Sequence, residues 1–268
     1  MDGHDNTLQK RSIAYRPAAA DTEFLFRDSM RGIRFFLEYA KAEDYLRAWG
    51  IRSTIVVFGS ARVRPGPDPD AGTAPIPGGH GRTLTSDRAA RWYQEARRFG
   101  HIASERGGAL HMHDGVRDNV IATGGGPGIM EAANRGAWEA GAPTIGFNIT
   151  LPHEQEPNAY STPDLTFSFH YFAMRKMHLA MRANALVVFP GGFGTFDELF
   201  EILTLTQTGK ARRTPIVLFD KDYWTRLINF QVMVEEGMIE ASDLELFHFA
   251  DDADAAWEAL IAQGLPVP

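Results

Sequence analysis

Three short apolar segments in this chain each run directly into a turn that contains glycine. They read STIVVFGSAR (53–62), NVIATGGGPG (119–128) and ALVVFPGGFG (185–194), and their turns are called the first, second and third turn below. Continuous apolar, β-branched runs are typical of strands that are buried on both faces of a parallel sheet. Because ligands bind at the carboxyl ends of strands in open α/β sheets, the three turns are predicted to line one crevice.

Segments with helical periodicity alternate with these strands along most of the chain. Helices are expected at 87–106, 129–141 and 173–184, and the alternation indicates one doubly wound α/β domain with a mostly parallel sheet. We expect this domain to span 51–268, with a polar tail and helices at 1–50 packing on its core. Residues 63–86 hold five prolines and five glycines, which predicts a long loop.

The composition excludes several classes of protein. The 268 residues are 44% hydrophobic and contain no cysteine, which excludes disulfides, thiolate catalysis and Cys-ligated zinc. A net charge of −7 argues against nucleic acid as a partner. Because no apolar run is long enough to span a bilayer and no signal-peptide core is visible, we expect a soluble cytoplasmic protein without a membrane partner.

The glycine turns do not match the common dinucleotide or ATP motifs. In the second turn Gly126 and Gly128 fit G-x-G, but Glu131 stands where a third glycine belongs, and both long turns lack the Lys and Ser/Thr of a phosphate-binding NTPase loop. Backbone N–H groups at a helix N-terminus still favour a monophosphate, to which Ser60 and Arg62 could add polar contacts. The alternatives are tight turns without a ligand and, for Arg62, a solvated surface charge.

Acidic residues follow the third turn in the stretch PGGFGTFDELFE (190–201). With Thr195 as the N-cap, Glu198 would close a Thr-x-x-Glu capping box, and the helix dipole would also favour Asp197. The other interpretation is that Glu198 is a reactive carboxylate beside a bound phosphate. Spacing alone leaves both open.

Basic side chains lie at helical spacing in FAMRKMHLAMRAN (172–184). Arg175 suits a phosphate clamp or the stabilisation of a leaving group, and its alternative is a solvated helical arginine. For His178 a structural role is expected, and Met174 is typical of core filling unless a motif argues otherwise.

Three of these stretches together resemble a known family. GGGPGIMEAANRGA (124–137), MRK (174–176) and PGGFGTFDE (190–198) are similar to the LOG family of nucleotide phosphoribohydrolases, also called lysine decarboxylase-like, and GSAR at 59–62 looks like its longer bacterial members. The resemblance spans roughly 51–236. It implies a Rossmann-like fold, a homodimer or higher homo-oligomer, and hydrolysis of a nucleoside 5′-monophosphate to free base and ribose 5-phosphate without metal or organic cofactor.

The resemblance also implies roles for particular residues. The catalytic pair falls on Arg175 and Glu198, and a carboxylate at Glu198 would stabilise the oxocarbenium-like ribose if Arg175 helps to keep it ionised. Glu131 is expected to contact a ribose hydroxyl. The whole set expected to bind substrate is Gly59, Ser60, Gly124, Gly125, Gly126, Gly128, Glu131, Met174, Lys176, Gly191, Gly192, Gly194 and Thr195. The preferred base, whether adenine, a cytokinin or another, is left open.

Two rival functions are weighed against this one. Lysine decarboxylation would need pyridoxal phosphate on a Schiff-base lysine, and of the chain's lysines only Lys176 lies in a motif. A nucleotide sensor or carrier could use the same fold without turnover. The presence of both Arg175 and Glu198 argues against such a protein.

Overall fold

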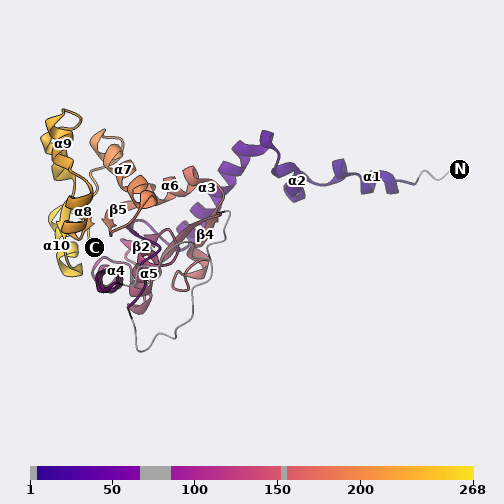
Figure 1. Ribbon diagram of the computed structural model, residues 1–268. Coiled ribbons are helices and arrows are strands. Elements are labelled where there is room, and N and C mark those ends of the chain that lie inside the picture. Colours follow the sequence, from indigo (N-terminus) through magenta and orange to yellow (C-terminus); the bar gives the residue numbers. More distant parts are fainter. Residues whose placement is uncertain (1–4, 67–85, 152–155) are drawn as a thin grey trace.

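A parallel sheet forms the centre of the protein in a computed structural model, which describes residues 5–66, 86–151 and 156–268 (Figure 1). Within these residues the sheet has seven strands in the order β4-β3-β2-β1-β5-β6-β7, and all pairs are parallel. The predicted α/β fold is confirmed. The strands are β1 (Thr54–Phe58), β2 (Val120–Thr123), β3 (Ile145–Ile149), β4 (Thr166–Phe169), β5 (Ala183–Val188), β6 (Ile216–Phe219) and β7 (His248–Ala250).

Helices cover both faces of the sheet, so alternate residues of the central strands enter two different cores. Ile55 and Val57 of β1 pack with helices of one face, whereas Val56 and Phe58 pack with helices of the other. This two-sided burial explains why the strands read as continuous apolar runs. One face carries α4 (Asp87–Arg106), α5 (Ile129–Glu139) and α10 (Ala253–Ala262), and the other carries α3 (Arg31–Ala48), α6 (Phe172–Met181), α7 (Phe193–Gln207) and α8 (Lys221–Leu227).

Two glycines bring α4 and α5 into close contact. A Cβ at Gly100 of α4 would lie 2.2 Å from the carbonyl oxygen of Ala133, and a Cβ at Gly136 of α5 would lie 1.8 Å from that of Arg97. Both clashes are with helix backbone, which cannot rotate away as a side chain can. The two helices therefore pack at a distance that only glycine permits.

The order of the strands places a topological switch point between β1 and β5. From β1 the chain passes through α4 to β2, whereas β5, on the other side of β1, is reached later through α6. The turns that follow β1 and β5 thus diverge to opposite faces of the sheet and leave a crevice at its carboxyl edge. The sequence predicted one crevice lined by all three turns, but only the first and third turns line it, and the second does not.

The N-terminal segment reaches away from the sheet (Figure 1). Helix α1 (Thr7–Arg11) and helix α2 (Thr22–Leu25) have no buried residues, while α3 buries Ala42, Glu43 and Leu46. The predicted long loop falls mostly outside the described residues, which omit 67–85. The remaining helices are α9 (Phe230–Glu235) and the 3-10 helices Ile13–Tyr15, Ala18–Ala20, Asp28–Met30, Pro163–Leu165 and Ala241–Leu246.

Helix boundaries agree with the sequence in some places and not in others. Helix α4 has the predicted bounds. The amphipathic pattern around 223–236 predicts one helix, but the structure has two there, α8 and α9, separated at Ile228 and Asn229. No helix within 5–66, 86–151 or 156–268 has the length and apolar character needed to cross a membrane.

Candidate functional site

A cleft of about 740 Å³ opens at the carboxyl ends of β1 and β5. Its walls come from the first turn, the third turn, α6 and the start of α7. Of the residues predicted to form the site, it brings together Gly59, Ser60, Arg175, Gly191, Gly192, Gly194, Thr195 and Glu198. Arg62 also lines it.

The third turn presents backbone donors to this cleft. Helix α7 begins at Phe193 with Gly192 as its N-cap, and no side chain caps it. The backbone N–H groups of residues 191–194 donate to no acceptor among the described residues. Unpaired N–H groups at a helix N-terminus are a ready site for an anion.

The capping box considered for Thr195 and Glu198 is not formed. Because α7 starts at Phe193, Thr195 already lies inside the first turn of the helix, and Glu198 lies further along it. The side chain of Thr195 instead packs on Gly191, where a Cβ would lie 2.0 Å from its Oγ1. Glu198 therefore does not close a capping box, which was the main structural alternative to a chemical role.

Glu198 is a buried carboxylate, and neighbouring groups only partly compensate for its loss of hydration. It is 6% exposed, and no described residue donates a hydrogen bond to it. Burial raises its pKa to about 7, and the positive charges of Arg175 and Lys176 oppose this shift without cancelling it. Arg175 thus favours the ionised form as expected, but desolvation is the larger effect.

Arg175 faces the same cleft from α6. Its Nε donates to the carbonyl oxygen of Phe147 at 2.8 Å, and its Nη atoms form no hydrogen bond or ion pair with a described residue. Burial lowers its pKa, which the charges of Glu198 and Asp197 partly offset, and an arginine so shifted still carries its charge at neutral pH. The guanidinium therefore keeps N–H groups available to a ligand.

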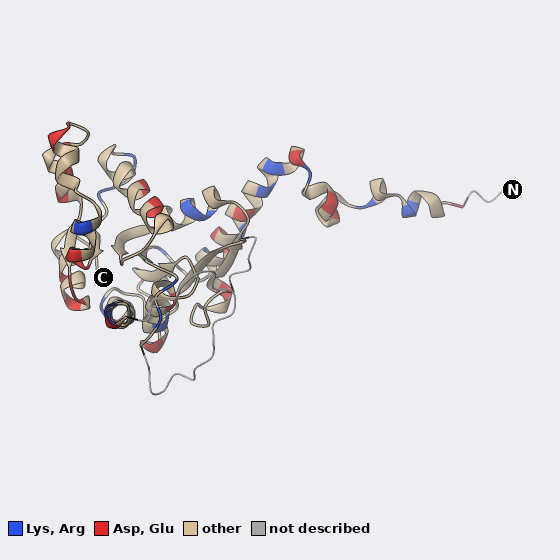
Figure 2. Ribbon diagram, viewed as in Figure 1, with Lys and Arg blue, Asp and Glu red and all other residues tan. Residues whose placement is uncertain are grey.

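Lys176 is held between two carboxylates of α7. Its Nζ lies 2.8 Å from Asp197 and 2.9 Å from Glu201, and Figure 2 shows the basic stretch of α6 beside the acidic stretch of α7. Asp197, for which the sequence suggested a helix-dipole role, and Glu201 therefore clamp α6 to α7. Lys176 does not line the cleft.

The second turn lies behind the cleft and shapes it indirectly. A Cβ at Gly128 would lie 2.4 Å from the carbonyl oxygen of Ser60, and one at Gly59 would lie 2.6 Å from the side chain of Ile129. The first and second turns can pack this closely only because residues 59 and 128 are glycines. The residues predicted to bind substrate that do not line the cleft are Gly124, Gly125, Gly126, Gly128, Glu131, Met174 and Lys176.

Glu131 is turned toward α4. Its Oε1 accepts a hydrogen bond of 2.7 Å from the hydroxyl of Tyr93, which is fully buried on the α4 face of the sheet. Met174 is partly buried against the core on the other side. Neither side chain lines the cleft, and their contacts with substrate stay predictions.

Sequence reasoning missed several aromatic residues of the cleft. Trp92 of α4 and Tyr223 of α8 form part of its wall, and Phe193 in the third turn is 95% exposed at its mouth. The position of Phe193 between two glycines could have identified it. Trp92 and Tyr223 come from helices distant in sequence, and no local pattern marks them.

Among the described residues, no three His, Asp or Glu side chains gather so that they could hold a metal ion. The ionisable groups of the cleft are instead Arg62, Arg175, Asp197, Glu198 and Tyr223.

The sequence matches known proteins over its second half. The profile of a family described as "Possible lysine decarboxylase" matches residues 130–260. The probable cytokinin riboside 5'-monophosphate phosphoribohydrolase LOG4 of Oryza sativa subsp. japonica is 30% identical over 139 residues, which are 50% of this chain and 59% of the relative. The cytokinin riboside 5'-monophosphate phosphoribohydrolase LOG7 of Arabidopsis thaliana is 29% identical over 127 residues, which are 46% and 57%. The chain thus spans a little over half the length of these relatives.

A solved structure shares the fold. The X-ray structure of TM1055 superposes with a TM-score of 0.50 at 19% identity and covers 78% of this chain and 99% of its own. The molybdenum cofactor carrier protein from Chlamydomonas reinhardtii is 21% identical, with a TM-score of 0.47, and covers 79% of this chain and 98% of its own. At an identity of 19%, the superposition with TM1055 shows a shared architecture and not a shared activity. The region that the family profile matches, residues 130–260, includes Arg175, the third turn and Glu198, and this region belongs to the lysine decarboxylase-like, or LOG, family.

Proposed function

We propose that this protein hydrolyses the N-glycosidic bond of a nucleoside 5′-monophosphate and releases the free base and ribose 5-phosphate. The observation that carries the proposal is the buried carboxylate of Glu198 in one cleft with the unpaired N–H groups of the third turn. The names of the similar rice and Arabidopsis proteins, which describe a phosphoribohydrolase of cytokinin riboside 5'-monophosphate, support this class of reaction.

The third turn suits the phosphoryl group of such a substrate. A Cβ at Gly192 or Gly194 would meet nothing within 4 Å, and neither residue has a positive φ. The packing and backbone of the protein therefore do not require glycine at these positions. A ligand that approaches the backbone closely does require it, as a phosphate held by N–H groups would.

Glu198 lies at a suitable distance along α7 from these donors. Gly194 and Glu198 are four residues apart in one helix, which corresponds to a rise of about 6 Å. That span is comparable to a ribose with its 5′-methylene group. A phosphate at the third turn would thus place the anomeric carbon near the carboxylate and the base beyond it.

The chemistry follows from this placement. As the bond between C1′ and the base nitrogen breaks, positive charge grows on the ribose ring, and an ionised Glu198 stabilises it. Water adds to C1′, Glu198 orients it and takes its proton, and the base leaves with the bonding electron pair and acquires a proton. The transferred atoms are those of one water molecule, so no further reactant is needed.

Arg175 balances the charges around this centre. Its guanidinium lies deep in the cleft with unpaired Nη atoms and interacts electrostatically with Glu198 without forming an ion pair within 4.0 Å. The N–H groups that remain are suited to the phosphate or to negative charge on the departing base. A direct ion pair would instead have used the N–H groups of Arg175 and the carboxylate oxygens of Glu198 for each other.

The test is product analysis on a panel of substrates. The protein is incubated with AMP, GMP, CMP, UMP and an N6-substituted adenosine monophosphate, and free base and ribose 5-phosphate are measured by chromatography. We expect both products in equal amounts from at least one nucleotide. Glu198→Gln, which keeps the shape of the side chain, should lower the rate by about 10²- to 10⁴-fold. Tight nucleotide binding without release of base would instead indicate a carrier and contradict the proposal.

A further inference from the structure

Asp220 lies between β6 and α8 and has an unusual backbone conformation. Its φ is 69° and its ψ is 84°, in the left-handed region that residues other than glycine rarely adopt. Its backbone N–H donates to the carbonyl oxygen of Ala250 at 2.8 Å. Such a conformation persists only where surrounding contacts hold it, and the side chain of Asp220 makes several such contacts.

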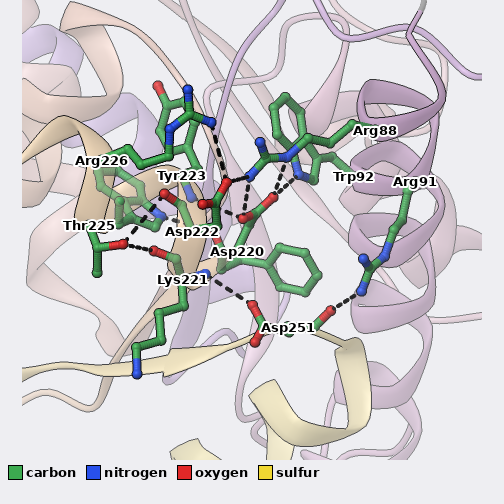
Figure 3. Close-up of polar contacts among 12 residues, drawn as sticks. Arg88, Arg91, Trp92, Asp220, Lys221, Asp222, Tyr223, Thr225, Arg226 and Asp251 are labelled. Carbon is green, nitrogen blue, oxygen red and sulfur yellow. Dashed lines mark hydrogen bonds and ion pairs between the residues drawn. The ribbon is translucent and has the colours of Figure 1, made fainter.

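The carboxylate of Asp220 joins three partners (Figure 3). Arg88 donates through Nε and Nη2, at 2.9 and 2.7 Å, and Trp92 donates through Nε1 at 2.7 Å. The backbone N–H of Tyr223 completes the set at 3.0 Å. Burial alone would raise the pKa of Asp220, but the hydrogen bonds from Arg88 and Trp92 outweigh it and hold the pKa below its ordinary value.

These contacts connect two walls of the cleft. Trp92 comes from α4 and Tyr223 from α8, and their rings meet edge to face with centroids 5.8 Å apart. Asp220 binds the indole of the first and the backbone of the second, so one side chain outside the cleft fixes both residues that line it.

Tyr223 passes this constraint to the third turn. Its hydroxyl donates to the carbonyl oxygen of Gly191 at 2.6 Å. In a trans peptide the C=O and the following N–H point in opposite directions. A carbonyl of Gly191 that is held toward Tyr223 therefore fixes the N–H of Gly192 to point away from it, and this N–H is one of the donors without a protein acceptor.

We propose that Asp220 is a positioning residue that sets the third turn for phosphoryl binding, acting through Trp92 and Tyr223. Asp220 does not itself line the cleft, and its effect is to orient a donor before the ligand arrives. The inference rests on the phosphoryl-binding role proposed above for the third turn, so its test begins with the protein free of ligand.

Two substitutions separate the steps of this relay. Tyr223→Phe removes only the hydroxyl that binds Gly191. Asp220→Asn keeps a cap for the N–H of Tyr223 and a residue that tolerates the left-handed conformation, but it removes the charge and one acceptor from Arg88 and Trp92. The matched control is Asp252→Asn, because Asp252 caps α10 in the same way through the N–H of Ala255 and lies outside the cleft.

Amide hydrogen exchange is measured first, at Thr195 and Phe196, whose N–H groups close the third turn on the carbonyl of Gly192. We expect exchange there to quicken about three- to tenfold in Tyr223→Phe and Asp220→Asn and to stay unchanged in Asp252→Asn. The dissociation constant for ribose 5-phosphate, measured by calorimetry, should rise by a similar factor. With nucleotide as substrate, KM should rise while kcat changes little.

Unchanged exchange in both variants would overturn the positioning role, whether or not the protein releases base. Faster exchange with no release of base from any nucleotide would leave the positioning role standing and reject the proposed reaction. A general loss of structure is recognised by melting temperature and by faster exchange in β1 and β5, which the relay does not reach.

Discussion

Arg175 occupies the space that a side chain at position 124 would need. A Cβ on Gly124 would lie 2.4 Å from Nη2 of Arg175 and 2.8 Å from the sulfur of Met130. The second turn does not line the cleft, yet through Gly124 it determines where the guanidinium can lie. The hydrogen bond from Nε to Phe147 fixes the other side of the same group.

Gly124→Ala should therefore impair activity more than folding. The methyl group would displace a flexible side chain and not backbone, and Gly124 has no positive φ that alanine could not adopt. We expect the melting temperature to change little and kcat/KM to fall by about 10²-fold, since small misplacements of catalytic groups are costly. Gly32→Ala in α3, where a Cβ meets nothing, is the control and should keep full activity. Equal activity of the two variants would show that Arg175 does not need its present position.

Gly194→Ala should have opposite effects on stability and binding. The new methyl group would lie in open space inside α7, so helix propensity should stabilise the protein by about 0.5–1 kcal/mol. It would also obstruct an anion at the N–H groups of the turn, and loss of one charged hydrogen bond weakens affinity about 10- to 100-fold. Thermal unfolding and calorimetry with ribose 5-phosphate measure the two effects. A variant that is more stable and binds equally well would place the phosphate elsewhere.

The rate should depend on the ionisation of Glu198. Burial raises the pKa of Glu198 to about 7 in the free protein, and its proposed role needs the ionised form. The value of kcat/KM should therefore rise tenfold per pH unit at low pH and level off near pH 7. The profile is measured with the nucleotide that the panel identifies. A rate that is flat between pH 5 and 8 would exclude Glu198 as the ionised group.

The same carboxylate should lower the stability of the fold as the pH rises above 4.5. Its pKa is about 7 when folded and has an ordinary value of 4.5, so the unfolded chain loses this proton first as pH rises. The cost begins above pH 4.5 and is complete above pH 7. Glu198→Gln carries no such charge and should be more stable than the original protein at pH 8, by up to about 3 kcal/mol.

Chemical denaturation at pH 8 and pH 4 measures this difference. The gain should be present at pH 8 and nearly absent at pH 4, where Glu198 is protonated in both states. Asp252→Asn, a similar loss of charge at an exposed helix cap, should show no such gain at pH 8. A Glu198→Gln variant that is less stable at pH 8 would mean that Arg175 depends on the carboxylate more than burial opposes it.

The fold was largely predictable because its signals are local. Apolar runs buried on both faces marked β1, β2 and β5, and the periodicity of 87–106 matched α4. The start of α7 was not predictable by the same means. Thr195 offers a good cap, but Gly192 also permits a helix to begin, and the packing of Thr195 on Gly191 decides between them.

Other features of the site depend on residues that are distant in sequence. Glu131 binds Tyr93, and Trp92 reaches Asp220, through contacts that no local pattern specifies. For Glu198 the sequence indicated the right neighbour, Arg175, but not that burial outweighs it. Such a balance depends on how much water the folded chain excludes, which spacing does not show.

The ion pairs of Lys176 with Asp197 and Glu201 have a consequence for comparing sequences. Two of the three residues in this clamp stand next to a member of the proposed reactive pair, Lys176 beside Arg175 and Asp197 beside Glu198. As sequences diverge, these ion pairs can be kept while Arg175 and Glu198 are replaced. The cleft then remains, but the proposed reaction is lost. In homologues of this chain, retention of the clamp without the arginine and glutamate would mark a descendant that binds nucleotides and no longer cleaves them.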